Sequence, residues 1–316
     1  MINYILNAIG LGATFLYGST GEIITEKAGH LNLGIPGVMC VGAAGGCAAL
    51  HYMIINGVTN GFLLVIIGII ASFGAGALMG AIYSFLTVTL KSNQNVTGLA
   101  MTTFGVGLMK YIMSGLIEGF SVPYLRAIPY FRFPFANTTN ALKYCGVMVF
   151  LAIIIALGAS FVLFKTKAGL HLRAVGENPA TADAAGINVT LYKYVATCIG
   201  CGIAGLGGLC YIMDYSGSQE GYLTIEALGW LAVALVIFAL WRPHLSIFGS
   251  IVFGALYIAG SFITRFNIIK TMAVNPLIEM LPYVVTIIVL IVTSIRDKKE
   301  NHPPSGLGVN YYREER

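Results

Sequence analysis

The chain has 316 residues, of which 57% are hydrophobic and only 10% are charged. Because about 25% of the residues of a typical soluble domain are charged, this composition excludes a soluble globular protein and indicates an integral membrane protein. The net charge of +5 is concentrated in residues 165–193 and in the C-terminal tail, which is typical of a cytoplasmic membrane face rather than of a nucleic-acid-binding surface.

The sequence predicts about nine spans, because a helix that crosses a bilayer needs about 20 mostly apolar residues. Five candidates precede residue 165, at 3–20, at two places within 31–90, at 96–117 and at 144–164. Four follow residue 193, at 194–213, 227–241, 245–264 and 275–295. The count becomes eight to ten if the segments next to Gly21 or Trp230 are re-entrant. We therefore expect an all-α polytopic membrane protein with its transmembrane domain at residues 1–295.

The distribution of positive charge predicts the orientation, since Lys and Arg are enriched in cytoplasmic loops. The two segments rich in these residues are 165–193 and 296–316, and four candidate spans separate them, so both lie on the cytoplasmic side. The N-terminus and the loops at 118–143 and 214–226 then lie outside. We expect residues 296–316 to form a loosely ordered cytoplasmic tail.

Small residues recur at four-residue intervals within the predicted spans. The positions are Gly42 and Gly46, Gly76 and Gly80, and Gly200, Ala204 and Gly208. Such stripes allow helices to pack backbone to backbone. Cys198-x-x-Cys201 has redox or metal spacing, but no second pair or histidine lies near it and it falls inside a predicted span. We interpret these cysteines as small apolar residues in helix contacts.

Residues 165–193 form a polar stretch with a short helix at its centre. Asn178 is a good N-cap and Pro179 suits the first helical position. Residues 180–185 supply about two turns, and Gly186 can adopt the left-handed closing conformation. Because a helix this short is marginal alone in water, it needs a surface to dock against. The alternative is an ordinary connecting loop with one helical turn.

Three motifs carry a resemblance to a known family. The segment RAVGENP at 173–179, continued by AAGI at 184–187, resembles the cytoplasmic coupling loop of ABC importer permeases of the branched-chain amino acid, simple sugar and nucleoside type. GEIITEKAGHLNLG at 21–34 resembles the signature of the nucleoside branch, whose permeases work with basic membrane lipoproteins. GWLAVALVIF at 229–238, followed by WRP, resembles a third block. Pro36 departs from the pattern, which has glutamate there, as does Asn93-Gln94-Asn95, which replaces an NEV-like triplet.

The resemblance implies a type II ABC-importer-like transmembrane domain, multi-pass in the bacterial cytoplasmic membrane. The chain is expected to form the translocation path for a nucleoside or a similar small polar solute; simple sugars or riboflavin-like solutes are the alternative. The implied partners are an ABC ATPase subunit, a second homologous permease that forms a heterodimer, and an extracytoplasmic substrate-binding lipoprotein. The chain has no Gly-x-x-x-x-Gly-Lys-[Ser/Thr] loop, so ATP and Mg²⁺ are expected on the ATPase. No catalytic residue, metal or cofactor is expected here.

Two groups of site residues follow. For coupling to the ATPase we expect Arg173, Glu177, Asn178, Pro179, Asp183 and Gly186. For the translocation pathway we expect Glu22, Asn32, Gln94 and Asn95, because polar groups within apolar segments are costly unless they pair or face a cavity. Glu26 and Lys27 are expected to pair at the cytoplasmic side. The alternative for the pathway group is interfacial snorkelling and helix capping.

Three other classes of protein fit the sequence less well. A secondary transporter needs ionisable groups deep in its spans, and Lys110 and Glu279 are the candidates. A membrane-embedded enzyme needs clustered His, Asp or Cys. The five histidines are scattered, at His30, His51, His171, His244 and His302. A scaffolding protein would not need a capped helix in a basic loop.

Overall fold

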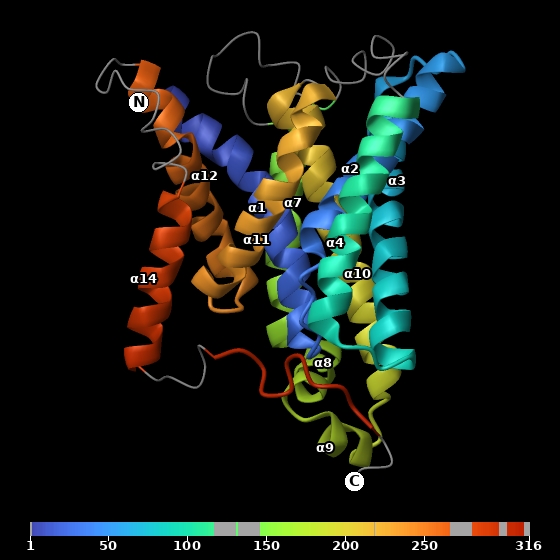
Figure 1. Ribbon diagram of the computed structural model, residues 1–316, viewed down its shortest axis with the longest axis vertical. Helices are drawn as coiled ribbons and strands as arrows, with labels where there is room; N and C mark the ends of the chain where they lie inside the picture. The colour runs from blue at the N-terminus through green and yellow to red at the C-terminus, as the bar shows by residue number, and fades with distance from the viewer. Residues whose placement is uncertain are drawn as a thin grey trace.

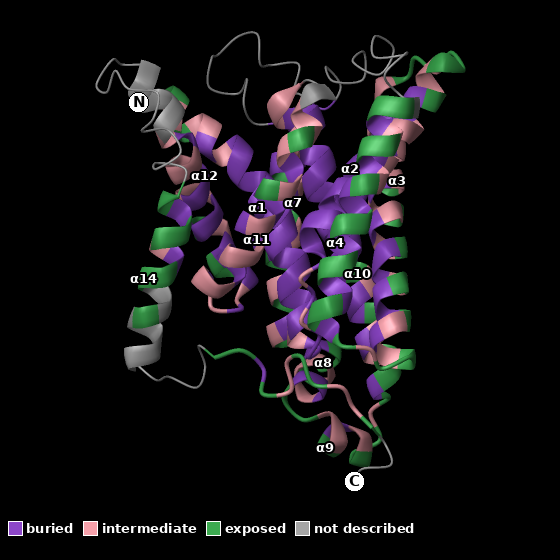
Figure 2. Cartoon of the chain, viewed as in Figure 1, coloured by how far each residue is buried: buried purple, intermediate pink, exposed green. Residues whose placement is uncertain are grey.

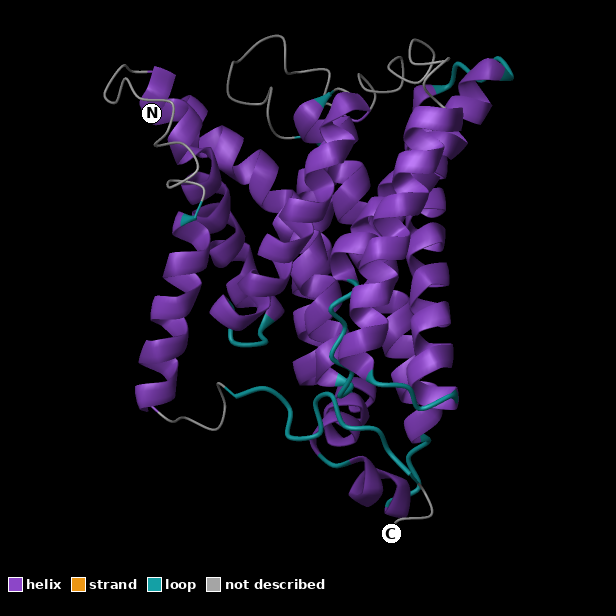
Figure 3. Cartoon of the chain, viewed as in Figure 1, coloured by secondary structure: helices purple, strands orange, loops and turns teal. Residues whose placement is uncertain are grey.

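The structure is a computed structural model that describes residues 2–116, 131, 146–217, 219–265, 280–296 and 302–312. Within these ranges the regular elements are helices and no strand occurs (Figures 1 and 3). The α-helices are α1 (Ile2–Lys27), α2 (Ile35–Ile55), α3 (Gly61–Ser84), α4 (Gln94–Lys110), α7 (Val147–Lys165), α8 (Lys167–Glu177), α9 (Pro179–Ala184), α10 (Val189–Cys210), α11 (Ile225–Phe238), α12 (Pro243–Arg265) and α14 (Leu281–Arg296). Wider π-helical turns continue α3, α4 and α10.

The length and composition of these helices confirm an all-helical, multi-pass membrane protein. Six of the described helices are long and apolar enough to cross a bilayer. They are Ile35–Ile55, Gly61–Thr89, Gln94–Gly115, Val147–Lys165, Val189–Ser216 and Gly221–Phe238. The segment Pro243–Ala259 is a shorter apolar helix. The count of nine spans stays a prediction, and most of the predicted loop at 118–143 lies outside the described residues, as does Glu279.

The first helix lies at the centre of the bundle. Its residues from Gly10 to Glu26 are all buried (Figure 2), because α1 packs against α7, α10, α11 and α12. The expected end of this helix at residue 20 is wrong, as is the re-entrant alternative at Gly21, since α1 runs unbroken to Lys27. A helix that is shielded from lipid by other helices can carry the carboxyl groups of Glu22 and Glu26 without exposing them to hydrocarbon.

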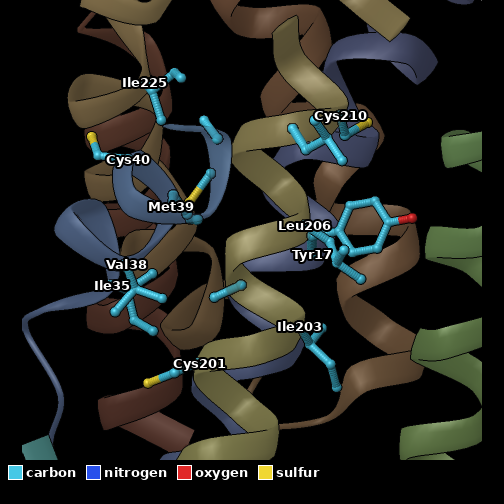
Figure 4. Close-up of a cluster of buried hydrophobic side chains, with 14 of the residues drawn as sticks. Tyr17, Ile35, Val38, Met39, Cys40, Cys201, Ile203, Leu206, Cys210 and Ile225 are labelled. Carbon is cyan, nitrogen blue, oxygen red and sulfur yellow. The ribbon is translucent and has the colours of Figure 1, made fainter. Parts of the chain in front are cut away.

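Backbone-to-backbone packing holds α10 against α1, α2 and α3, as the small-residue stripes predicted. A β-carbon at Gly42 in α2 would overlap the backbone of Gly205 in α10. One at Gly200 would overlap the carbonyl oxygen of Gly21 in α1. Side chains fill the space between these close contacts; Tyr17 of α1 lies beside Leu206 of α10 (Figure 4), and its hydroxyl donates to the Met148 carbonyl of α7 at 2.8 Å.

The segment from 214 to 242 differs from its prediction. Asp214, expected in an acidic loop, is only 3% exposed because it lies within the π-helical turn Tyr211–Ser216 that continues α10. The short apolar span expected at 227–241 is a 14-residue helix, α11, that ends at Phe238. A tight turn follows in which Leu240 and Trp241 both have φ of +54°. Left-handed conformations are costly for bulky residues, so this turn is held by its surroundings.

A polar layer closes one end of the bundle. Helices α8 and α9 lie there together with the C-terminus (Figure 1). Residues 302–312, which we call the C-terminal segment, form a strap with a turn at 305–308 that is hydrogen-bonded to α8, to the α1–α2 connection and to the α3–α4 connection. The expectation of a loosely ordered tail is therefore wrong for these eleven residues, because their backbone and side-chain groups have partners in the layer.

Valine at Gly42 should destabilise the protein, whereas valine at Gly74 should not. The first forces α2 away from α10; the second adds a side chain where no atom of another residue lies within 4 Å. Overpacking costs about 1–3 kcal/mol, so the thermal midpoint of purified Gly42→Val in detergent should fall by several degrees. Equal midpoints for the two variants would contradict the close packing.

Candidate functional site

The centre of the candidate site is the α1–α2 loop, residues 28–34, which contains part of the GEIITEKAGHLNLG motif. Side chains of α3 and α4 form hydrogen bonds with its backbone groups. The Leu31 N–H donates to Gln94 Oε1 at 2.9 Å, and Tyr83 donates its hydroxyl to the Leu31 carbonyl at 2.7 Å. Thr102 donates to the carbonyl of Leu33 at 2.8 Å. A loop buried at the end of a membrane bundle needs such partners, since an unpaired backbone group costs free energy there.

Asn32 is the best-connected side chain of this loop and is 1% exposed. The backbone N–H of Asn32 donates to Glu22 Oε1 at 3.2 Å. The side-chain Oδ1 accepts from Gly34 N at 3.0 Å, and the side-chain Nδ2 donates to Cys201 Sγ at 3.3 Å. Cys201 thus packs as a small residue and also serves as a weak acceptor. The structure therefore brings Glu22, Asn32 and Gln94 together around one loop.

The two carboxyl groups of α1 have different surroundings. Glu26 Oε2 accepts from Trp241 Nε1, so the indole in the turn before α12 holds this end of α1. The expected pairing of Glu26 with Lys27 stays a prediction. Glu22 is completely buried, and its Oε2 has no hydrogen-bond partner among the described residues. Sequence reasoning noted the WRP motif but did not assign Trp241 a role.

His30 lies in the same loop and is 1% exposed. Its Nδ1 lies 2.8 Å from Thr197 Oγ1 and its ring packs edge-on against Tyr83. Burial, together with the positive charge of Lys193, holds the pKa of His30 well below its usual value. The imidazole is therefore neutral at physiological pH, and its role in the loop is a hydrogen bond rather than a charge.

The short helix α9 has the predicted cap residues. Asn178 Oδ1 accepts from Thr181 N at 3.1 Å, Pro179 occupies the first turn, and Gly186 has φ of +82°. One face of α9 packs on its own chain, with Ala182 in a small cluster with Val175 and Val189. Thr181, Ala184 and Ala185 are exposed at the outer face of the layer.

The acidic residues expected to face an ATPase contact the C-terminal segment. Glu177 Oε2 accepts from Ser305 N at 3.2 Å and from Ser305 Oγ at 3.0 Å, and Asp183 Oδ2 accepts from the Tyr311 hydroxyl at 2.7 Å. Arg173 stacks its guanidinium 5.2 Å from the ring centre of Phe164. Whether these residues also register a partner subunit stays a prediction.

The end of α8 meets the α1–α2 loop directly. A β-carbon at Gly176 would overlap the carbonyl oxygen of Lys27, and it would lie 3.2 Å from Gly29 N. The C-terminal segment reinforces this contact, because Gly306 N donates to the Gly176 carbonyl at 2.9 Å and Gly308 N donates to the Gly29 carbonyl at 3.3 Å. The loop that carries α9 and the loop that holds Asn32 are therefore in backbone contact.

The C-terminal segment also reaches the start of α4. Asn310 Nδ2 donates to the Lys91 carbonyl at 2.7 Å, and Asn310 Oδ1 accepts from Gln94 Nε2 at 3.2 Å. Gln94 thus links the α1–α2 loop to the C-terminal segment. Sequence reasoning missed this role of residues 302–312, because a partner more than 200 positions away leaves no local pattern.

Asn95 differs from the other predicted pathway residues because it is exposed. On α4, at 3.6 residues per turn, Asn95, Thr103 and Lys110 fall within an arc of about 80°, and all three are exposed along with Leu99 between them. Polar side chains are costly in hydrocarbon. This arc is therefore better suited to face a water-filled path or a protein partner than to face lipid.

Known proteins of related sequence identify the class. The family described as "Branched-chain amino acid transport system / permease component" matches residues 4–291, and the chain belongs to it. No solved structure matches the chain. The chain is 32% identical to the putative glucose ABC transporter permease protein TsgC13 of Haloferax volcanii over 98% of each chain. It is 29% identical both to the nucleoside ABC transporter permease protein NupC of Lactococcus lactis, over 90% of each chain, and to the guanosine ABC transporter permease protein NupQ of Bacillus subtilis, over 88% of each.

Family membership and fold together define the protein as the permease subunit of an ABC importer in the cell membrane. Such permeases are transport subunits rather than enzymes, because ATP hydrolysis resides in a separate ATPase partner. The resemblance drawn from the coupling-loop, GEIITEKAGHLNLG and WRP motifs is confirmed. The residue-level roles drawn from it stay predictions.

Leucine at Gln94 should damage the fold, whereas leucine at Asn95 should damage transport. Gln94→Leu leaves the Leu31 N–H buried without an acceptor, which costs about 1–3 kcal/mol and lowers the thermal midpoint in detergent. Asn95→Leu is exposed, so its stability should change by less than about 0.5 kcal/mol, while uptake falls because the polar arc of α4 is interrupted. Normal uptake by Asn95→Leu would remove Asn95 from the pathway.

Proposed function

We propose that this permease imports a nucleoside or a similar neutral polar solute and is driven through α9, which serves as the coupling helix for the ATPase. The observation that supports this is the backbone contact between Gly176, at the end of α8, and the α1–α2 loop at Lys27 and Gly29. It gives a force applied at α9 a direct route into the membrane bundle.

The route has three steps. The ATPase engages the exposed face of α9, around Thr181, and displaces it when its nucleotide sites close. Helix α8 follows, because α9 packs on it and the two are joined at Asn178. Gly176 then moves the α1–α2 loop, and with it the hydrogen bonds that Asn32 makes to Glu22 and Cys201. Since α1 is buried along nearly its whole length, a change at its end reaches the middle of the bundle.

The polar arc of α4, formed by Asn95, Thr103 and Lys110, supports the proposal that the solute is uncharged and rich in hydroxyl groups. Asn95 and Thr103 offer amide and hydroxyl groups, and no carboxylate lies on α4. Relatives named for nucleosides, guanosine and glucose transport solutes of this kind. Because a nucleoside and a sugar both present ring hydroxyls, glucose or a riboflavin-like solute is the second candidate.

The proposal includes the remaining subunits of the importer. ATP and Mg²⁺ bind the ATPase subunit, and an extracytoplasmic lipoprotein captures the solute. A second, homologous permease completes the path, with the polar arc of α4 facing it across a shared channel. Asn95, Thr103 and Lys110 would then line water rather than lipid.

The rival function is a proton-coupled transporter, and the structure indicates which residues it would use. It would use buried carboxyl groups, and Glu22 and Glu26 are such groups. The rival predicts uptake that collapses when the proton gradient is removed and that continues without ATP. Family membership favours the opposite dependence.

Arginine at Thr181 should abolish ATPase recovery, whereas arginine at Thr59 should not. Both threonines are exposed, but Thr181 lies on α9 and Thr59 lies in the turn between α2 and α3, at the other end of the bundle. We expect the wild type and Thr59→Arg to co-purify with the ATPase, a second permease and the lipoprotein from gently solubilised membranes. The amount of ATPase that co-purifies with Thr181→Arg should be at least tenfold lower, while the permease itself is recovered in normal amount.

The same preparations test the transport step in vesicles. ATP-dependent uptake of labelled guanosine, compared with labelled glucose, distinguishes the two solute classes. Uptake that needs no ATP but stops with a proton uncoupler, or recovery of the wild-type chain without an ATPase, would contradict the proposal.

A further inference from the structure

A cavity of about 430 Å³ opens in the polar layer, lined in part by Asp183 of α9 and by His30 of the α1–α2 loop. Its other walls come from the π-helical turn that continues α3, the connections from α3 to α4 and from α9 to α10, the start of α10 and the C-terminal segment. Two lysines line it, Lys91 and Lys193, together with the polar side chains of Thr87, Asn188, Thr190 and Asn310. A cavity of this size matches those that hold small molecules or headgroups.

Lys193 is the unusual member of this lining. It is only 3% exposed, and no carboxylate or hydrogen-bond acceptor pairs with it among the described residues. Its buried neighbour His30 is neutral and pairs with Thr197, so it offers no negative charge. Lysine is almost never this buried unless it is paired. An anion bound in the cavity would supply a partner for this buried ammonium.

The start of α10 faces the same space. Val189 and Thr190, the first two residues of this 22-residue helix, line the cavity. The cap Asn188 Oδ1 accepts from Leu191 N at 3.0 Å, so it occupies the third backbone N–H rather than the first two. The first N–H groups of a helix and its dipole favour a bound anion. Two independent features thus point to negative charge at one place.

The remaining charges fit a single anionic group. Lys91 also lines the cavity, and its ammonium lies 4.2 Å from the ring centre of Tyr312. Asp183 also lines the cavity, but its Oδ2 is engaged by the Tyr311 hydroxyl. Two ammonium groups, a helix N-terminus and several hydroxyl and amide donors are the usual donor set for a phosphate group.

We propose that this cavity binds a phosphate group, presented either by an anionic lipid headgroup or by a small phosphate compound of the cytoplasm. The bound anion neutralises Lys193 and bridges α10 to the C-terminal segment. Because that segment also contacts Gly176 and Gln94, anion binding fixes the layer through which the coupling loop acts. The site is separate from the solute path and does not depend on which solute the importer carries.

The test uses the full chain, purified without lipid, and compares wild type with Lys193→Met. One arm titrates inorganic phosphate and pyrophosphate at constant ionic strength. The other places the protein in nanodiscs of phosphatidylcholine alone or with phosphatidylglycerol. The readout is the thermal midpoint, with native mass spectrometry of bound lipid in the second arm. Lys110→Met is the matched control for loss of one lysine. Lys110 is the last residue of α4, at the end away from Gln94.

We expect the wild type and Lys110→Met to gain several degrees in at least one arm. Lys193→Met should respond with at least tenfold weaker apparent affinity. Without anion, Lys193→Met should be as stable as the wild type or more stable, because an uncompensated buried charge has been removed. A merely structural lysine would give the reverse, with a less stable variant and an unchanged response to anions.

A second variant keeps the proposal testable if Lys193→Met does not fold. Thr190→Asp places a carboxylate in the first turn of α10, where it favours the helix and competes with an external anion. It should fold and lose the anion response. A gain in the phosphate arm identifies a small phosphate compound, and a gain confined to phosphatidylglycerol identifies a lipid. Equal responses from wild type and both variants, or no response in either arm, would overturn the proposal.

Discussion

The structure depends on hydrogen-bond partners for the backbone N–H and C=O groups of the α1–α2 loop, because little water reaches this loop. A loop that leaves a buried helix at the end of a membrane bundle exposes N–H and C=O groups that hydrocarbon cannot pair. Gln94 and Thr102 of α4, Tyr83 of α3 and Glu22 of α1 itself supply the partners. The loop is therefore fixed to all of these helices together. A movement of the loop moves them all.

This constraint explains why the polar layer can act on the membrane bundle. Helix α8 carries a glycine, Gly176, where it crosses the loop, so the two backbones touch without an intervening side chain. The C-terminal segment crosses both and hydrogen-bonds to each. A rigid contact of this kind transmits displacement, whereas a contact made through long side chains would absorb it. The fold thus joins α9, the proposed coupling helix, to the residues around Asn32 by short steps.

Local chemistry in the sequence predicted a large part of this arrangement. The cap residues Asn178 and Gly186 predicted the short helix, because capping depends on neighbours in the chain. The small-residue stripes predicted the packing of α10, because spacing along one helix determines its face. The link between Trp241 and Glu26 and the strap formed by residues 302–312 could not be predicted, since their partners lie far apart in sequence. Asp214 and Lys193 looked like loop and surface charges, and only the fold shows that they are buried.

The most direct test of coupling through the α1–α2 loop is hydrogen exchange of residues 28–34 in the reconstituted importer. Exchange would be compared with and without ATP, under conditions in which the ATPase is shown to close. Because exchange reports local opening, the account predicts that protection of this loop changes together with that of residues 174–178. Unchanged protection of residues 28–34 during closure would mean that force enters the bundle by another route, and it would contradict the account.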